Sequence, residues 1–227
     1  MNYSDLIIFI MEMMGTVAFA ASGAMLGIRK KMDLFGICVE QLACLIICLM
    51  VCVLGVTTSV GGGAIRDVTL GIIPPGMFRR PIYTIVAVMV SLGLFALLYI
   101  RRNLLDGRIG QLYDLLMNIS DAIGLGIFTV VGINTAWNAG YYQLFLLVFV
   151  GVITGVGGGL LRDVMAQEKP YILTKHIYAC ASIIGALVCV YTKSTLGNLT
   201  AMMVGASAVV IVRFLAMHYR WNLPRIE

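Results

Sequence analysis

Charged residues are scarce in this sequence, and their scarcity excludes an ordinary soluble domain. Only 12% of the 227 residues are charged and 60% are hydrophobic, with a mean hydropathy of +0.97. An average soluble domain carries about 25% charged residues. No polar segment is long enough to form a separate soluble catalytic or ligand-binding domain. The composition therefore predicts a protein whose solvent is the lipid bilayer.

Basic residues are missing from the N-terminal end, where a cleavable signal would need them. Such a signal carries a basic leader before a short apolar core. Here Asp5 precedes the first apolar run, and the first basic residue is Arg29. We therefore expect the first helix to remain in the protein.

Signals for an enzyme or a cofactor are also lacking. The only two histidines, His176 and His218, are far apart and lack metal-ligand spacing. The glycine-rich phrase at 155–159 lacks the Gly-Lys-Ser/Thr ending of a phosphate loop. Membrane topology explains the net charge of +5 better than nucleic acid binding does. We expect no enzymatic activity, no metal site, no cofactor and no nucleic acid partner.

Long apolar runs fill almost the whole chain. A helix needs about 20 mostly apolar residues to cross a hydrocarbon core of about 30 Å. We predict an all-α membrane protein with seven transmembrane helices, at about 6–28, 35–60, 82–100, 112–133, 142–161, 176–192 and 197–217.

The distribution of Lys and Arg predicts the orientation, because cytoplasmic loops carry an excess of both. The loops on one side hold Arg29, Lys30, Lys31, Arg101, Arg102, Arg108, Lys169, Lys175, Arg220 and Arg225. The loops on the other side hold Arg79, Arg80 and Lys193. We predict a multi-pass protein of the bacterial inner (plasma) membrane, with the N-terminus outside and the C-terminus in the cytoplasm.

One phrase occurs twice, 96 positions apart. Gly-Gly-Gly-Ala-Ile-Arg-Asp-Val occupies residues 61–68, and Gly-Gly-Gly-Leu-Leu-Arg-Asp-Val occupies residues 157–164. We predict internal repeats at 6–103 and 112–192. Three spans per repeat is an odd number, so the second copy must insert upside down, which is a common transporter plan. The helix at 197–217 has no partner copy and is expected to pack outside the pair.

The glycine triplets are the first candidate site residues: Gly61, Gly62 and Gly63, and Gly157, Gly158 and Gly159. Each glycine costs a helix about 1 kcal/mol relative to alanine. We predict that the triplets kink or unwind their helices and line a pathway, where freed carbonyls coordinate a cation. The alternative is close helix packing, which the four-residue spacing of Gly151, Gly155 and Gly159 also favours.

An arginine and an aspartate follow each triplet, at or near membrane depth. Intramembrane charges are pathway candidates by default, so we predict pathway charges or ion pairs at Arg66, Asp67, Arg162 and Asp163. Neighbouring residues on a helix do not face each other, so we expect any ion pair to join different helices. Alternatively, the charges lie near the span ends and reach the membrane surface.

Other polar residues lie within the predicted spans. Glu12 and Asp121 open the first and fourth spans, where a carboxylate could attract cations, although Asp121 could equally satisfy a neighbouring backbone or hydroxyl group. Tyr83, Tyr178 and Tyr191 fit the aromatic belts at the membrane surface. The predicted pathway hydroxyls are Ser22, Ser59, Thr129 and Thr154.

The motifs resemble the prokaryotic trimeric intracellular cation (TRIC) channel family, also described as a glycine transporter domain family. The likeness covers essentially the whole chain. It rests on Phe-Ala-Ala-Ser-Gly at 19–23, Arg-Lys-Lys-Met-Asp-Leu-Phe-Gly at 29–36, the doubled glycine phrase, and Phe-Thr-Val-Val-Gly at 128–132. The resemblance implies a three-plus-three-plus-one helix plan, a homotrimer, and a potassium-permeable pore in each protomer, lined by kinked second and fifth helices.

Three functions remain open at this point. The first is a passive channel for a monovalent cation, potassium or sodium. The second is a transporter of glycine or a similar small neutral amino acid, since a half-helix N-terminus suits a carboxylate. The third is a helical scaffold without transport. Membrane lipid is an expected partner in each case.

Overall fold

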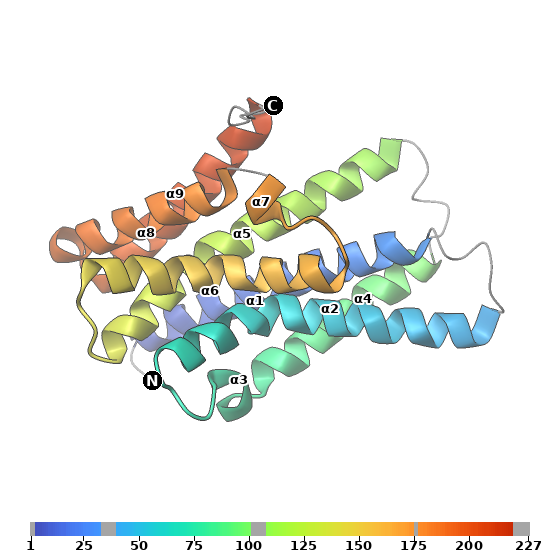
Figure 1. Cartoon of the computed structure of the whole chain (residues 1–227), viewed down its shortest axis with the longest axis horizontal. Coiled ribbons are helices and arrows are strands. Elements are labelled where there is room, and N and C mark those ends of the chain that lie inside the picture. The colour runs from blue at the N-terminus through green and yellow to red at the C-terminus, as the bar shows by residue number, and fades with distance from the viewer. Residues whose placement is uncertain (1–2, 33–39, 101–107, 175–176, 220–227) are drawn as a thin grey trace.

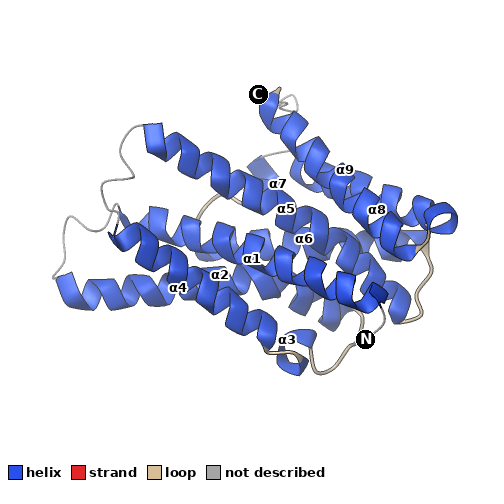
Figure 2. Cartoon of the chain, turned by 180° about the vertical axis from the view of Figure 1, so that it is seen from behind, coloured by secondary structure: helices blue, strands red, loops and turns tan. Residues whose placement is uncertain are grey.

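The computed structural model describes residues 3–32, 40–100, 108–174 and 177–219. All regular structure in these ranges is helical, and the long helices form one bundle (Figure 1, and from behind in Figure 2). The helices are α1 (Tyr3–Met32), α2 (Glu40–Thr69), α3 (Gly76–Arg79), α4 (Ile82–Ile100), α5 (Arg108–Asn138), α6 (Leu144–Met165), α7 (Tyr171–Thr174), α8 (Ile177–Leu196) and α9 (Asn198–His218). The predicted all-α fold is confirmed.

Each of the seven predicted spans coincides with a helix. Six described segments are long and apolar enough to cross a membrane, and they belong to α1, α2, α5, α6, α8 and α9. α4 supplies a shorter apolar segment, Ile82–Leu97. α2 and α6 continue past the predicted ends at 60 and 161, so both Arg-Asp pairs lie within helices. The predicted start of the second span, at 35, lies outside the described residues.

The bundle consists of two similar three-helix units and one further helix. α1, α2 and α4 pack on one another, and α5, α6 and α8 do the same. Figure 1 shows that α1 and α5 run in opposite directions, as do α2 and α6. Opposite directions in corresponding helices are what an inverted repeat requires. α9 packs on α5 and α8.

A turn and a four-residue helix follow each helix that carries a glycine triplet. After α2, Gly71 has a φ of +70°, and α3 comes next. After α6, Gln167 has a φ of 53°, and α7 comes next. Left-handed backbone is uncommon at a non-glycine residue. Each connector therefore has its left-handed residue two positions after the end of its helix.

Candidate functional site

The two glycine triplets bring α2 and α6 into backbone contact. A Cβ atom on Gly62 would overlap the carbonyl oxygen of Thr154, and a Cβ atom on Gly158 would overlap that of Thr58. The contact is reciprocal, as at a two-fold axis, because each helix offers a glycine to the other's carbonyl. Close approach of this kind is possible only without side chains at the crossing.

α2 and α6 run as uninterrupted helices through both triplets. The prediction of an unwound stretch with free carbonyls is therefore wrong. The triplets are buried, apart from the half-buried Gly63. Because the helical hydrogen bonds are kept and the crossing backbones gain van der Waals contact, the glycines allow the close packing that the alternative predicts. Gly63 lines a cavity, and the role of the triplets as pathway lining stays a prediction.

Two phenylalanines fill the middle of the bundle beside this crossing. The rings of Phe19 on α1 and Phe128 on α5 stack with centroids 5.2 Å apart. Gly124 and Gly15 make room for them, since a Cβ on Gly124 would overlap Phe19 and one on Gly15 would lie 3.2 Å from Phe128. A Cβ on Gly158 would lie 3.3 Å from the Phe19 ring. Aromatic rings and glycine backbones therefore separate the two ends of the bundle.

In each copy the arginine pairs with the aspartate that follows it. Nε of Arg66 lies 2.8 Å from Oδ1 of Asp67, and Nε of Arg162 lies 2.9 Å from Oδ1 of Asp163. The prediction that neighbouring residues would not pair is wrong. The long arginine side chain folds back along its own helix and reaches the short aspartate beside it.

The second oxygen of each aspartate binds the connector that follows. Oδ2 of Asp67 accepts a hydrogen bond of 2.6 Å from the backbone N–H of Gly76. Oδ2 of Asp163 accepts one of 2.8 Å from that of Tyr171. Hydrogen bonds to a charged group are about twice as strong as neutral ones. Each aspartate therefore fastens a four-residue helix, α3 or α7, to the end of α2 or α6.

Two related polar clusters contain these pairs. We call Glu12, Arg66, Asp67 and Tyr83 the first-half site, and Asp121, Arg162, Asp163 and Tyr178 the second-half site. In the first the tyrosine hydroxyl donates to Glu12. In the second it donates to Asp121 over 3.4 Å. The prediction of surface belts is wrong for Tyr178, which is 1% exposed.

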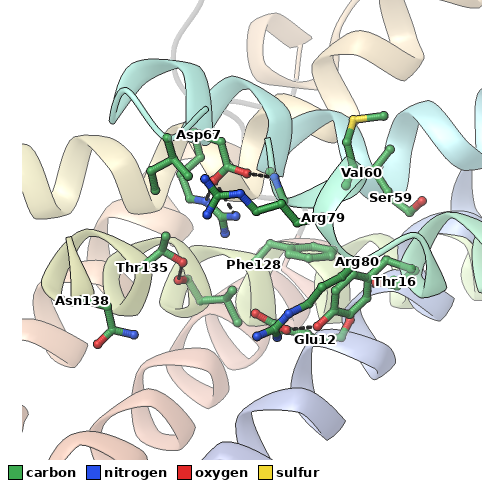
Figure 3. A pocket seen from close by; sticks show the side chains of 17 residues that line it. Glu12, Thr16, Ser59, Val60, Asp67, Arg79, Arg80, Phe128, Thr135 and Asn138 are labelled. Atoms are coloured by element: carbon green, nitrogen blue, oxygen red, sulfur yellow. Dashed lines mark hydrogen bonds and ion pairs between the residues drawn. The ribbon is translucent and has the colours of Figure 1, made fainter. Parts of the chain in front are cut away.

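The first-half site opens into a cavity of about 430 Å³ at the end of the bundle where α1 begins. Glu12 and Arg66 both line this cavity. Figure 3 shows Glu12 and Asp67 on opposite sides of it. Further polar groups come from Ser59, Arg79, Arg80, Thr135 and Asn138. A liquid water occupies about 30 Å³, so the cavity has room for a hydrated ion.

The second-half site is closed. Nη1 of Arg162 lies 2.8 Å from Oδ1 of Asp121 on α5, and it also donates a hydrogen bond to Ser22 on α1. The side chains of Arg162, Asp121 and Asp163 are each 1% exposed. Here an ion pair does join different helices, as predicted, and the alternative of a side chain that reaches the membrane surface is wrong for Arg162.

The four residues with predicted pathway hydroxyls lie in three different parts of the bundle. Ser59 lines the cavity, and Ser22 contacts the second-half site. Thr129 and Thr154 are fully buried, and their hydroxyls bind backbone carbonyls of their own helices. They pack against glycines between α5 and α6. The structure does not bring these two threonines to the cavity.

A second cavity, of about 290 Å³, lies at the opposite end of the bundle. Its lining includes Asp163, Tyr171, Lys30 and Glu168. Lys30 and Glu168 form an ion pair of 2.8 Å across it. Burial raises the pKa of Tyr171, while the guanidinium of Arg162, 5.3 Å from the ring centroid, opposes that shift. Asp163 therefore belongs both to the closed site and to the wall of this cavity.

Comparison with known proteins gives the family. A family profile described as Glycine transporter matches residues 9–46, 46–99 and 118–194. One solved structure of TRIC cation channels is 35% identical, with a TM-score of 0.76 and 96% of both chains covered. A prokaryotic TRIC channel crystallised in 0.5 M KCl is 31% identical, with a TM-score of 0.79, and the match covers 96% of this chain and 99% of that one. The chain belongs to the TRIC channel family.

Curated relatives of this TRIC family member are membrane proteins. The UPF0126 inner membrane protein YadS of Escherichia coli K12 is 36% identical over 221 residues, which cover 96% of both chains. A UPF0126 membrane protein of Vibrio cholerae is 34% identical over 96% of this chain and 82% of its own length. The apolar helices and these relatives support a multi-pass inner membrane protein, and TRIC membership assigns it to membrane transport rather than to the enzymes.

Sequence reasoning missed the roles of two tyrosines and one arginine in this TRIC family member. Tyr83 and Tyr178 each stand second in their helices, α4 and α8, and this shared place in the repeat could have paired them with the two carboxylates. Arg213 comes from α9 and lies 3.7 Å from Asp121 through Nη2. Because α9 has no counterpart in the repeat, Arg213 has no matching residue in the other half that could have revealed its role. Among the residues in the described ranges, no group of His, Cys, Asp and Glu could hold a metal ion.

Proposed function

We propose that this TRIC family member is a channel for monovalent cations that works as a homotrimer, with one pathway in each subunit. The observation that carries the proposal is the match to solved TRIC cation channels over 96% of the chain at 31% and 35% identity. A further match, the trimeric intracellular cation channel orthologue of Rhodobacter sphaeroides, has a TM-score of 0.77 at 26% identity. Its name supports the trimer.

The proposed pathway runs from the cavity of the first-half site to the second cavity at the other end of the bundle. Between them lie the crossing of Gly62 with Gly158 and the stacked Phe19 and Phe128. The pathway is closed at this point in the present arrangement. Opening requires α2 and α6 to move apart. Because the residues at their crossing are glycines, no side chain would then obstruct the widened passage.

Glu12 is the carboxylate that we propose attracts cations into the first cavity. Asp67, the other acid that lines the cavity, is held by Arg66 at 2.8 Å. Arg79 and Arg80 also line the cavity, but both are exposed to solvent. Salt therefore screens their repulsion of an entering cation, with a Debye length of about 8–10 Å. A single half-buried carboxylate discriminates only weakly between potassium and sodium. We therefore expect both ions to permeate with similar ease.

The proposed orientation is supported by the basic residues at the other end of the bundle. Arg29 and Lys30 lie at the end of α1 that borders the second cavity. Because basic residues accumulate in cytoplasmic loops, we place the second cavity at the cytoplasmic side. The first-half cavity then opens to the outside.

Electrical recording tests the proposal. Purified protein reconstituted in a planar bilayer should give single-channel currents that reverse near the potassium equilibrium potential in a potassium chloride gradient. Gly93→Ala is the control, because nothing lies within 4 Å of its Cβ position and Gly93 lines neither cavity. It should conduct like the unmodified protein. Correctly assembled protein that stays electrically silent at all voltages would overturn the proposal.

Measurement of glycine flux on the same sample tests the alternative of a glycine carrier. The family profile described as Glycine transporter is the reason to test it. Vesicles that contain the protein should show no saturable uptake of radiolabelled glycine beyond that of empty vesicles. Saturable uptake that alanine competes for, without current, would replace the channel by a carrier.

A further inference from the structure

Helix α9, which has no counterpart in the repeat, places the side chain of Arg213 beside the second-half site. Arg213 is 2% exposed, and its guanidinium lies 4.7 Å from the centroid of the Tyr178 ring. Its Nη2 atom is 3.7 Å from Oδ2 of Asp121. This distance suits an ion pair but exceeds a direct hydrogen bond.

Four buried polar atoms of Arg213, Arg162 and Asp121 have no hydrogen-bond partner. They are Nε and Nη2 of Arg213, Nη2 of Arg162 and Oδ2 of Asp121. These side chains meet beside Gly159, whose Cβ position would lie 3.7 Å from Nη2 of Arg162 and 2.7 Å from the hydroxyl of Tyr178. Buried donors and acceptors of this kind are almost always paired in native proteins, through ordered water if not through protein.

The chemistry of the four atoms selects water over an ion. The guanidinium atoms only donate and the carboxylate oxygen only accepts, so one bridging group must do both. Water does both, whereas a halide cannot donate to Asp121. The charges also balance, because Arg162 and Arg213 face the carboxylates of Asp121 and Asp163, which leaves no net charge to attract an ion.

The first half of the molecule lacks this arrangement. No described helix packs on α1 and α4 as α9 packs on α5 and α8. There Glu12 and Arg66 face the open cavity instead. The first half thus has an open cavity beside Glu12, whereas the second half has the side chain of Arg213 beside Asp121.

We propose that Arg213 is a positioning residue that locks the second-half site closed by means of a buried water shared with Asp121 and Arg162. The guanidinium fills the space beside Tyr178 and completes the hydrogen bonds that would otherwise draw in bulk water from the second cavity. The lock concerns the packing of this site, so it stands or falls independently of the proposed ion conduction.

Cysteine accessibility tests the lock. In a cysteine-free background, Ser22→Cys reports the second-half site, because Ser22 is 0% exposed and bonded to Arg162. The thiol is a weak acceptor in place of the hydroxyl, so every comparison is made within the Ser22→Cys background. With Arg213→Ala, the rate at which a small water-soluble thiol reagent labels Ser22→Cys should rise about tenfold or more. A tenfold rise corresponds to a decrease of about 1.4 kcal/mol in the free energy of local opening. Arg213→Gln keeps an amide donor and should give a smaller rise.

Two reference positions separate a lock from general loosening. Thr135→Cys lines the first cavity and should react at the same rate with or without Arg213. Ala24→Cys is 0% exposed in a different part of the core and should stay protected. Unchanged labelling of Ser22→Cys in Arg213→Ala, or a rise that Ala24→Cys shares, would overturn the lock.

A structure at a resolution that shows ordered water tests the bridge. Density for one water between Nη2 of Arg213 and Oδ2 of Asp121 is expected. A direct hydrogen bond between these two atoms, or a halide in their place, would overturn the water site.

Discussion

The two halves of this protein build one site twice and use it in opposite ways. The first-half site opens into a cavity, and the side chain of Arg66 is 13% exposed. The second-half site is sealed, and the side chain of Arg162 is 1% exposed. Both arginines bind the next aspartate with nearly the same geometry. The difference teaches that the duplicated motif fixes the local pairing, while the neighbouring helices decide whether the site is open.

Two sequence differences explain the contrast. Residues 19–23 of α1 and 128–132 of α5 both begin with Phe and end with Gly, and their fourth position is Ser22 in the first half and Val131 in the second. Ser22 accepts a hydrogen bond from Arg162, whereas Val131 lines the cavity and can accept none. The other difference is α9, which covers the second half alone and delivers Arg213.

The largest effect is expected when one carboxylate of each site is neutralised. Asp121→Asn leaves Arg162 and Arg213 in the core with one fewer negative charge, and breaking a buried pair costs about 3–5 kcal/mol. Glu12→Gln removes a half-buried carboxylate and should cost about 1 kcal/mol or less. Thermal unfolding in detergent compares the two variants. Equal losses would mean that the two sites are equally buried in solution.

The glycine crossing should tolerate no side chain on either helix. Gly62→Ala and Gly158→Ala each place a Cβ on a backbone carbonyl, which cannot move without shifting a helix, so each should cost about 3 kcal/mol. Gly93→Ala on α4 is the control, because nothing lies within 4 Å of its Cβ position, and it should be neutral or stabilising. Unfolding midpoints measure all three. A clear difference between Gly62→Ala and Gly158→Ala would contradict the reciprocal contact.

The third glycines of the triplets should differ, unlike the second ones. A Cβ on Gly159 would lie 2.7 Å from the hydroxyl of Tyr178, whose ring is fixed by burial, so Gly159→Ala should cost about 2 kcal/mol. A Cβ on Gly63 would meet only Nη2 of Arg66 at 3.8 Å, so Gly63→Ala should be tolerated. The same unfolding assay applies. Comparable losses in both variants would show that the first-half site is as tightly packed as the second.

The smallest effect is expected from the tyrosine hydroxyls. Tyr83→Phe removes a hydrogen bond to Glu12 and should cost about 1 kcal/mol. Tyr178→Phe removes a weak contact of 3.4 Å with Asp121, so its loss should be smaller. The reverse order of the two losses would argue against the different geometry of the two sites.

The sequence predicts the helices well because apolar length and loop charge are local properties. The duplicated phrase likewise points to Gly62, Gly158 and the charged pairs. Unwinding at the triplets was wrongly predicted because the intrinsic helix cost of glycine ignores the partner helix, where the missing side chain allows backbone contact. The sealed state of Arg162 could not be predicted, since it depends on Ser22 and Arg213, residues distant in the chain with no shared period.

The most direct test of the central claim is the potassium conductance of Glu12→Gln channels relative to the unmodified protein at low and high ionic strength. If the first-half cavity is the entrance of the pathway, the variant should conduct less at low salt, and the difference should shrink at high salt as screening increases. Equal conductance of the two proteins at low salt would contradict the placement of the pathway in the first-half cavity.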